Sequence, residues 1–157
     1  MSALVTSPFE RPTRRRSPCM VLIADDHDES RRTQRLVLEH FGFAVTEAQN
    51  GLDALAIALA SHPSIILIDV ILPEVDGCEL ARMLRADPAT RHASLLAVSA
   101  MSDPETRERA LRAGCDEFVT KPVPPLQLVR LIQGYARRRV DRTYDFDPIE
   151  REGTQRL

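Results

Sequence analysis

The sequence predicts an α/β fold in which a parallel sheet is covered by helices on both faces. From Met20 to about Arg139, short apolar runs alternate with segments whose apolar residues recur at helical spacing. The runs VLIA and IILI are apolar at every position, as expected for parallel strands that are buried on both faces. Strands alternating with helices of this length favour right-handed crossovers, and hence a doubly wound parallel sheet.

Five strands are expected at residues 20–24, 43–48, 64–69, 94–99 and 116–120, which read MVLIA, FAVTEA, SIILID, SLLAVS and DEFVT. Helices are expected between and after them. Their apolar residues at helical spacing are Leu52, Leu55, Ala56 and Leu59, then Leu80, Met83 and Leu84, and finally Leu128, Val129, Ile132 and Ala136. Start and stop signals separate the elements, namely Asn50-Gly51, Pro63, Asp87-Pro88, Asp103-Pro104 and Gly114. Together they predict five β-α units.

The composition is that of an ordinary soluble globular protein. The chain has 157 residues, of which 43% are hydrophobic and 28% charged, and its formal net charge is −2. Nothing in this balance calls for nucleic acid or a membrane. The three cysteines form no C-x-x-C pair, which argues against a disulfide framework or a zinc site. No apolar run reaches the roughly 18 residues of a membrane span, so a cytoplasmic protein is expected.

The domain is expected to occupy residues 19–139. Residues 1–18 combine three prolines with several arginines and are interpreted as a flexible basic arm, and residues 140–157 as a C-terminal tail without a convincing period. The arginine clusters at 14–16 and 137–139 are short and lack interleaved aromatic residues. We therefore interpret them as solvated ends rather than nucleic-acid contacts.

Polar residues stand where the predicted strands end. They are Asp25 and Asp26 after the first strand, Asp69 after the third, Ser99 after the fourth and Lys121 after the fifth. The carboxyl ends of parallel strands share one edge of the sheet, where ligands bind. Three carboxylates there would raise one another's pKa unless a cation intervened, and oxygen ligands favour Mg²⁺. A lysine and a hydroxyl beside that ion suit phosphoryl oxygens, and the central Asp69 could act as a nucleophile.

This pattern resembles the receiver domain of two-component response regulators over about residues 19–139. The matching positions are the acidic pair Asp25 and Asp26, then Asp69 with Pro73 and Gly77, then Ser99, and finally Lys121-Pro122. The resemblance implies the flavodoxin-like (βα)5 fold with strand order 2-1-3-4-5, an order for which a receiver is a known example.

The resemblance also implies a role for each site residue. Asp69 would be the phosphoacceptor, and Mg²⁺ the cofactor. Asp26 and Asp69 would bind the ion directly, the Ile71 carbonyl would complete the protein ligands, and Asp25 would act through water. Ser99 and Lys121 would contact the phosphoryl group, while Pro73, Gly77 and Pro122 would shape the loops, with a cis Lys121-Pro122 bond.

Phe118 has two interpretations. Its position three residues before Lys121 is most simply that of a core aromatic residue. The resemblance instead implies a switch residue, exposed before phosphorylation and drawn inward afterwards. The helix DPETRERALRAG has only a thin apolar stripe around Ala110 and Leu111, so it is the helix expected to move.

The implied function is signalling rather than enzymatic turnover. A histidine kinase or histidine phosphotransfer protein would supply the phosphoryl group, and the chain would catalyse only its own phosphotransfer and dephosphorylation. A downstream protein would bind the face formed by the fourth helix, fifth strand and fifth helix. No direct nucleic-acid contact and no membrane insertion are expected, and the chain would be a monomer or a phosphorylation-dependent dimer.

An alternative comes from the sequence Asp26-His27-Asp28. It looks like the D-x-D motif of haloacid-dehalogenase-like phosphatases, in which Asp26 would be the nucleophile. Ser30 is a poor match to the Thr or Val of that family, and no acidic pair follows Lys121 before the tail. The four histidines show no metal-ligand spacing and are expected on the surface, although His27 could tune the site.

Overall fold

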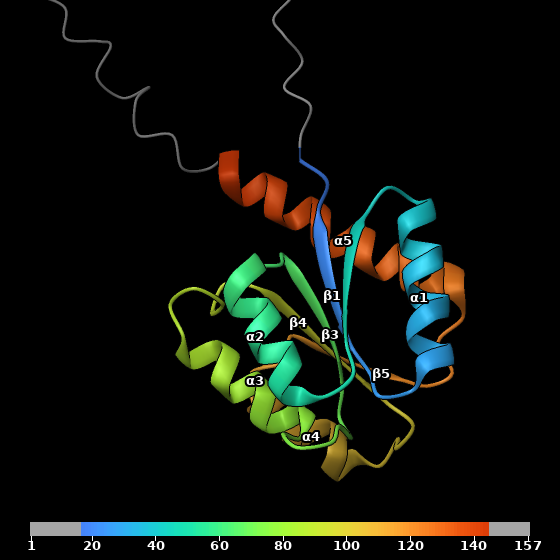
Figure 1. Cartoon of the computed structure of the whole chain (residues 1–157), viewed down its shortest axis with the longest axis vertical. Coiled ribbons are helices and arrows are strands. Elements are labelled where there is room, and N and C mark those ends of the chain that lie inside the picture. The colour runs from blue at the N-terminus through green and yellow to red at the C-terminus, as the bar shows by residue number, and fades with distance from the viewer. Residues whose placement is uncertain (1–16, 145–157) are drawn as a thin grey trace, which may run out of the picture.

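Five parallel strands form one sheet with helices on both faces (Figure 1). The computed structural model describes residues 17–144. The elements are β1 Met20–Ala24, α1 Asp28–His40, β2 Ala44–Ala48, α2 Gly51–Ser61, β3 Ile65–Asp69, α3 Gly77–Ala86, β4 Ser94–Ser99, α4 Pro104–Arg112, β5 Glu117–Thr120 and α5 Pro125–Tyr144. The strand order is β2-β1-β3-β4-β5, which confirms the predicted topology.

The sheet separates two apolar layers. Figure 1 shows α1 and α5 over one face and α2, α3 and α4 over the other. Side chains alternate along a strand, so Ile66 and Ile68 of β3 belong to the layer under α2 and α3, whereas Ile65 and Leu67 belong to the layer under α5. All five residues of β3 are buried, as the continuous apolar run predicted.

The apolar residues expected to face the core in α2 lie largely on its outer side. Leu52 is 51% exposed and Leu59 is 37% exposed, whereas Ala54 and Ala58 are buried. Small residues line the inner side because α2 packs closely on its neighbours: a Cβ added to Gly51 would lie 2.2 Å from the Val75 carbonyl oxygen. Leu52 and Leu59 therefore contribute little to the packing of α2, whereas Leu55 is half-buried against the core.

The last helix continues to Tyr144, five residues past the expected end near Arg139. The exposed Arg137 and Arg138 follow the last expected apolar residue, Ala136, so the sequence carries no apolar period that would predict the continuation. Residues 1–16 of the predicted arm and 145–157 of the predicted tail lie outside the described residues. Within residues 17–144, no helix is both long enough and apolar enough to cross a membrane.

Candidate functional site

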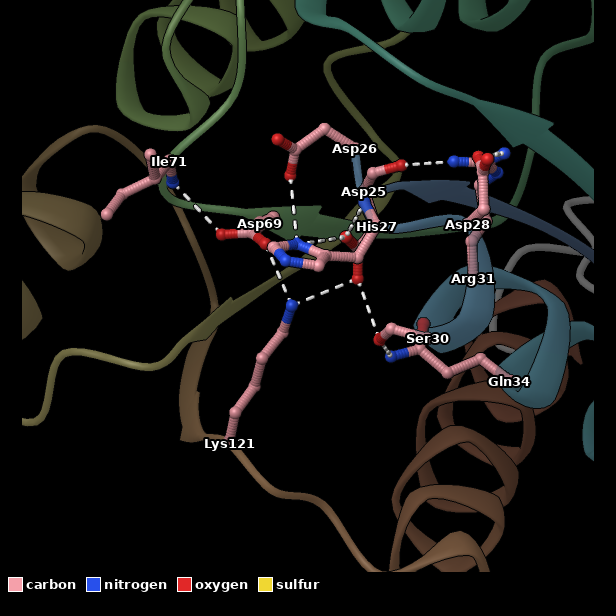
Figure 2. A network of polar contacts seen from close by, with 10 residues as sticks. All are labelled: Asp25, Asp26, His27, Asp28, Ser30, Arg31, Gln34, Asp69, Ile71 and Lys121. Atoms are coloured by element: carbon pink, nitrogen blue, oxygen red, sulfur yellow. Dashed lines mark hydrogen bonds and ion pairs between the residues drawn. The ribbon is translucent and has the colours of Figure 1, made fainter.

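Two buried carboxylates lie side by side at the carboxyl edge of the sheet. Asp25 directly follows β1 and Asp69 ends β3, and these two strands are neighbours. Asp25 is 2% exposed and Asp69 is 8% exposed. Lys121, which directly follows β5, donates hydrogen bonds from Nζ to Asp69 Oδ2 at 2.8 Å and to Asp25 Oδ2 at 3.0 Å (Figure 2). One ammonium group therefore bridges the two buried acids.

Asp25 is held ionised by its surroundings. Burial is the largest single effect on its pKa and raises it, but hydrogen bonds from the His27 amide, the Lys121 ammonium and the Ser30 hydroxyl together outweigh burial and lower the pKa. The His27 amide and the Ser30 hydroxyl each lie 2.9 Å from this carboxylate. For Lys121 the sign is opposite: burial alone would lower the pKa, because it disfavours the charged ammonium. The hydrogen bonds and charges of Asp69 and Asp25 outweigh burial, so the pKa of Lys121 is raised.

A buried arginine supports the loop that carries the acidic pair, and the sequence analysis missed it. Arg31 of α1 donates from one guanidinium nitrogen to the Asp25 carbonyl at 2.7 Å and from the other to Asp28 at 2.6 Å. Its Nε lies 3.3 Å from Glu47 of β2. Arg31 is only 7% exposed, although a charged residue on a helix is ordinarily assigned to the surface. The sequence signal for this role was Asp28, an acid three residues before Arg31 and therefore on the same side of the helix.

Four side chains form a cluster with the chemistry of a metal site. Ligand atoms of Asp25, Asp26, His27 and Asp69 all lie within 4.8 Å of one another. The three carboxylates fit a hard divalent cation, and Asp26 is the most accessible of them, with 38% of its side chain exposed. The fourth member is His27, whose Nδ1 lies 3.4 Å from Asp26 Oδ1 (Figure 2). Its side chain is exposed, as the sequence analysis expected, and it lies beside the acidic pair.

Ser99 ends β4 and is fully buried at the same edge of the sheet. Its hydroxyl accepts a hydrogen bond from the Met101 amide at 3.0 Å, and its carbonyl accepts one from the Lys121 amide at 2.8 Å. Among the described residues, no hydrogen bond joins its hydroxyl to Asp69 or to the Lys121 ammonium. Ser99 therefore stands near the bridged acids without being part of their network.

Phe118 points inward in this structure. It is 7% exposed and belongs to the core cluster that includes Ala110 and Ala113. The outward position expected before phosphorylation is therefore not the one observed, and the interpretation as a core aromatic residue fits better.

The loop residues predicted to shape the site make specific backbone contacts. The Pro73 carbonyl accepts hydrogen bonds from the Val75 amide at 2.9 Å and the Gly51 amide at 3.3 Å. Gly77 begins α3 directly against β3, where an added Cβ would lie 2.2 Å from the Asp69 carbonyl oxygen. The Lys121-Pro122 peptide bond is cis, as the resemblance implied.

Comparison with known proteins identifies the family. The sequence model of the response regulator receiver domain matches residues 21–133. The polar-differentiation response regulator DivK of Brucella ovis is 32% identical over 115 residues, which cover 73% of this chain and 94% of DivK. A 14.6 kDa protein of Leptolyngbya boryana is 38% identical over 115 residues, covering 73% of this chain and 88% of that protein.

Solved structures agree with this result. A CheY-like response regulator receiver domain protein from Methanospirillum hungatei superposes with a TM-score of 0.76 at 25% identity, over 80% of this chain and 99% of that one. The haloacid-dehalogenase-like alternative finds no support in these matches, and Asp28, its second acid, is bound to Arg31 instead. The chain belongs to the family of response regulator receiver domains.

Proposed function

We propose that this chain is the phosphoacceptor of a two-component or phosphorelay system, with Asp69 as the residue that becomes phosphorylated. The observation that carries this proposal is the Lys121 ammonium, which binds Asp69 and Asp25 at the edge of an acidic cluster. A structural lysine would be expected to neutralise one acid. Here the ammonium binds Asp25 and Asp69 while the carboxylate of Asp26 lies in the same cluster, so the site has a deficit of positive charge that a divalent cation would correct.

The proposed reaction transfers a phosphoryl group from a histidine nitrogen of the donor to an Asp69 carboxylate oxygen. The carboxylate attacks phosphorus, the nitrogen–phosphorus bond breaks, and its electron pair stays on the donor imidazole. The Ile71 amide donates to Asp69 Oδ1 at 3.0 Å, while Lys121 holds Oδ2, so both oxygens are oriented before the reaction.

Each remaining site residue has a defined part in this proposal. Asp26, Asp69 and the Ile71 carbonyl would hold Mg²⁺, and Asp25 would act through water. The ion supplies positive charge that neutralises the phosphoryl oxygens during transfer. The Lys121 ammonium and the Ser99 hydroxyl would contact the transferred group, and the ammonium can do so by rotating away from Asp25.

The output would be binding of a protein partner in the cytoplasm. A histidine kinase or histidine phosphotransfer protein would phosphorylate Asp69, and the chain would catalyse only its own phosphotransfer and dephosphorylation. The partner would bind the face made by α4, β5 and α5, with the chain monomeric or dimeric upon phosphorylation. Only Thr106 and Ala110 of α4 are buried, so little packing holds this helix and a modest change at the site could displace it.

The test is to locate the phosphate after incubation with acetyl phosphate and Mg²⁺. Intact-mass spectrometry should show one acid-labile phosphate on the wild type and on Asp53→Asn, an exposed carboxylate on α2 that serves as the control. Asp69→Asn and an EDTA-treated wild type should show none. Labelling of Asp26 would support the phosphatase alternative, and labelling that survives in Asp69→Asn would refute the proposal.

A further inference from the structure

A cavity opens at the edge of the sheet opposite the acidic cluster, where the strands begin. Its volume is about 1040 Å³, and its lining includes the stretch before β1, the end of α2, the loop between α3 and β4, and the later turns of α5. Figure 1 shows these turns of α5 beside the start of β1. The chemistry proposed for Asp69 uses none of these segments, so the cavity has no part in it.

The cavity is strongly positive, although the chain as a whole carries a formal net charge of −2. Among the described residues, four arginines line it against a single carboxylate, that of Asp116. Two histidines of the lining, His62 and His92, become cationic on protonation. The four arginines are Arg85, Arg91, Arg138 and Arg139. A concave site with one sign of charge attracts anions, because its walls concentrate the field of the charges.

Two of these arginines hold one wall of the cavity in place. Arg85 donates hydrogen bonds to the Arg91 and Ala93 carbonyls at 2.7 and 2.6 Å. Arg139 donates to the carbonyl between them, that of His92, at 2.7 Å. Three consecutive carbonyls therefore bind guanidinium groups, which fixes the backbone that carries the Arg91 side chain. A fixed backbone lowers the entropy lost when that side chain binds a ligand.

The other two arginines, Arg91 and Arg138, offer charge that no acid neutralises. Arg85 is paired with Asp116 at 2.9 Å, whereas Arg91 and Arg138 form no ion pair among the described residues. Arg91 Nε makes a hydrogen bond of 3.3 Å to the neighbouring histidine ring, and the guanidinium of Arg138 lies 5.0 Å from the centre of the Tyr135 ring. These contacts position the two guanidinium groups and leave their charge available to an anion.

The arrangement of the two groups determines the kind of anion. Arg91 belongs to the loop between α3 and β4 and Arg138 to α5, so a ligand that uses both must reach across the cavity. Guanidinium groups bind phosphate oxygens in pairs, and a volume of about 1040 Å³ suits a small molecule larger than orthophosphate. We propose that this cavity binds a small anion with more than one phosphate group, held by Arg91 and Arg138. The inference is independent of phosphorylation at Asp69.

Calorimetric titration of the full chain with inorganic tripolyphosphate tests this proposal. EDTA in the buffer prevents metal-mediated binding at the acidic cluster. At physiological salt we expect tripolyphosphate to bind at least about tenfold more tightly than orthophosphate. Arg91→Gln and Arg138→Gln should each weaken tripolyphosphate binding by about tenfold, because losing a charge-assisted hydrogen bond costs roughly this factor. The control Arg107→Gln removes an exposed arginine of α4 outside the cavity and should change nothing.

Two further measurements complete the experiment. Acetyl phosphate labelling of Asp69 with Mg²⁺ should be unchanged in all three arginine variants, which shows that they remain folded. Titration with ATP identifies the source of the phosphates. Tighter binding of ATP than of tripolyphosphate indicates a nucleotide, and equal or weaker binding indicates a phosphate chain alone; both results support the proposal.

Four results would overturn the proposal. Tripolyphosphate could bind no more tightly than orthophosphate, or Arg91→Gln and Arg138→Gln could bind it as the wild type does. Arg107→Gln could weaken binding as much as they do, in which case the attraction is diffuse. Finally, a short double-stranded DNA could bind more tightly than tripolyphosphate and lose affinity in the same two variants, which would make the surface a nucleic-acid contact.

Discussion

Replacing Gly77 with alanine should damage both the stability of the fold and the site. Gly77 is the first residue of α3, and its added Cβ would lie 2.2 Å from the Asp69 carbonyl oxygen and 2.8 Å from the Val70 Cα. Non-bonded heavy atoms ordinarily stay about 3.5 Å apart, so the contact with the oxygen is too short by about 1.3 Å and the contact with the carbon by about 0.7 Å. Both atoms belong to the backbone of the central strand and its exit, which cannot turn aside as a side chain would.

Overpacking of this kind costs about 1–3 kcal/mol, and we expect Gly77→Ala to lie at the upper end, because α3 must shift away from β3. The matched control is Gly134→Ala in α5, whose added Cβ meets nothing within 4 Å. In a helix interior with room for the methyl group, this change should stabilise by about 0.5–1 kcal/mol.

Urea unfolding followed by circular dichroism measures both variants. Gly77→Ala should lower the transition midpoint and also slow acetyl phosphate labelling of Asp69, because the backbone that moves carries the acceptor. Equal urea midpoints for the two variants would show that α3 can move away from β3 at little cost in stability, and the steric argument would then be wrong.

Four further predictions concern the charges of the site and the motion of α4. Mg²⁺ at a hundredfold excess over its dissociation constant should raise the free energy of unfolding by about 2.7 kcal/mol, and Asp26→Asn should abolish most of this rise in a thermal melt. The lowered pKa of Asp25 stabilises the native state at pH values above 3.8, the ordinary pKa, and this stabilisation is lost as the pH falls through the lowered pKa of the native state. In Asp25→Asn the free energy of unfolding should therefore fall less steeply with decreasing pH in this range. The raised pKa of Lys121 stabilises the native state at pH values below 10.5, the ordinary pKa, and this stabilisation is lost as the pH rises through the raised pKa of the native state. In Lys121→Met, urea titrations should show that this alkaline loss in the free energy of unfolding has disappeared. Phosphorylation of Asp69 should shift amide resonances across residues 100–120, and shifts confined to the loops beside the acids would contradict motion of α4.

The strands were predictable because their signal is local. A doubly buried strand is apolar at every position, and the predicted bounds of all five strands agree with the structure within one residue. The acidic pair, Asp69 and Lys121 could be placed at one edge for the same reason, since strand ends in a parallel sheet converge regardless of the details of packing.

The orientation of α2 was not predictable because the helix is apolar on nearly every side. Leucine and alanine both count as apolar, so the row through Leu52 and Leu59 is as periodic as the row through Ala54 and Ala58. Close packing at Gly51 decides between the two rows, and it requires small residues facing inward. This choice depends on the distance between neighbouring elements, which no single segment of sequence contains.

The buried arginine that supports the site also escaped the sequence analysis. Arg31 lies on a polar stretch typical of a solvated helix face, and its role depends on contacts with Glu47 of β2 and with the Asp25 carbonyl. The sequence around Phe118 is compatible with both an inward and an outward side chain, so it could not predict the inward position. These features arise after the backbone is in place, so they follow from tertiary contacts rather than from periodicity.

The lifetime of the phosphorylated state should depend on two apolar side chains beside the site. Ile71 and Met101 each stand two residues past a site residue, and their amides donate to Asp69 Oδ1 and to the Ser99 hydroxyl at 3.0 Å. Their side chains are 57% and 48% exposed, and we expect them to flank the path by which water reaches the phosphorus. Neither can orient that water by a hydrogen bond or act as a general base, so we expect a long-lived acyl phosphate.

The double substitution Ile71→Asn and Met101→Glu should hasten loss of the phosphate by about tenfold or more, because general-base assistance is typically worth at least that factor. Phosphorylation itself should persist, since the acids and Lys121 are untouched. Leu52→Asn, which changes an equally exposed apolar side chain on α2, should leave the rate unchanged. The decay is measured by intact mass after removal of acetyl phosphate. If the wild-type phosphate is lost within seconds and the double substitution does not alter that rate, water reaches the phosphorus by a path that these side chains do not guard.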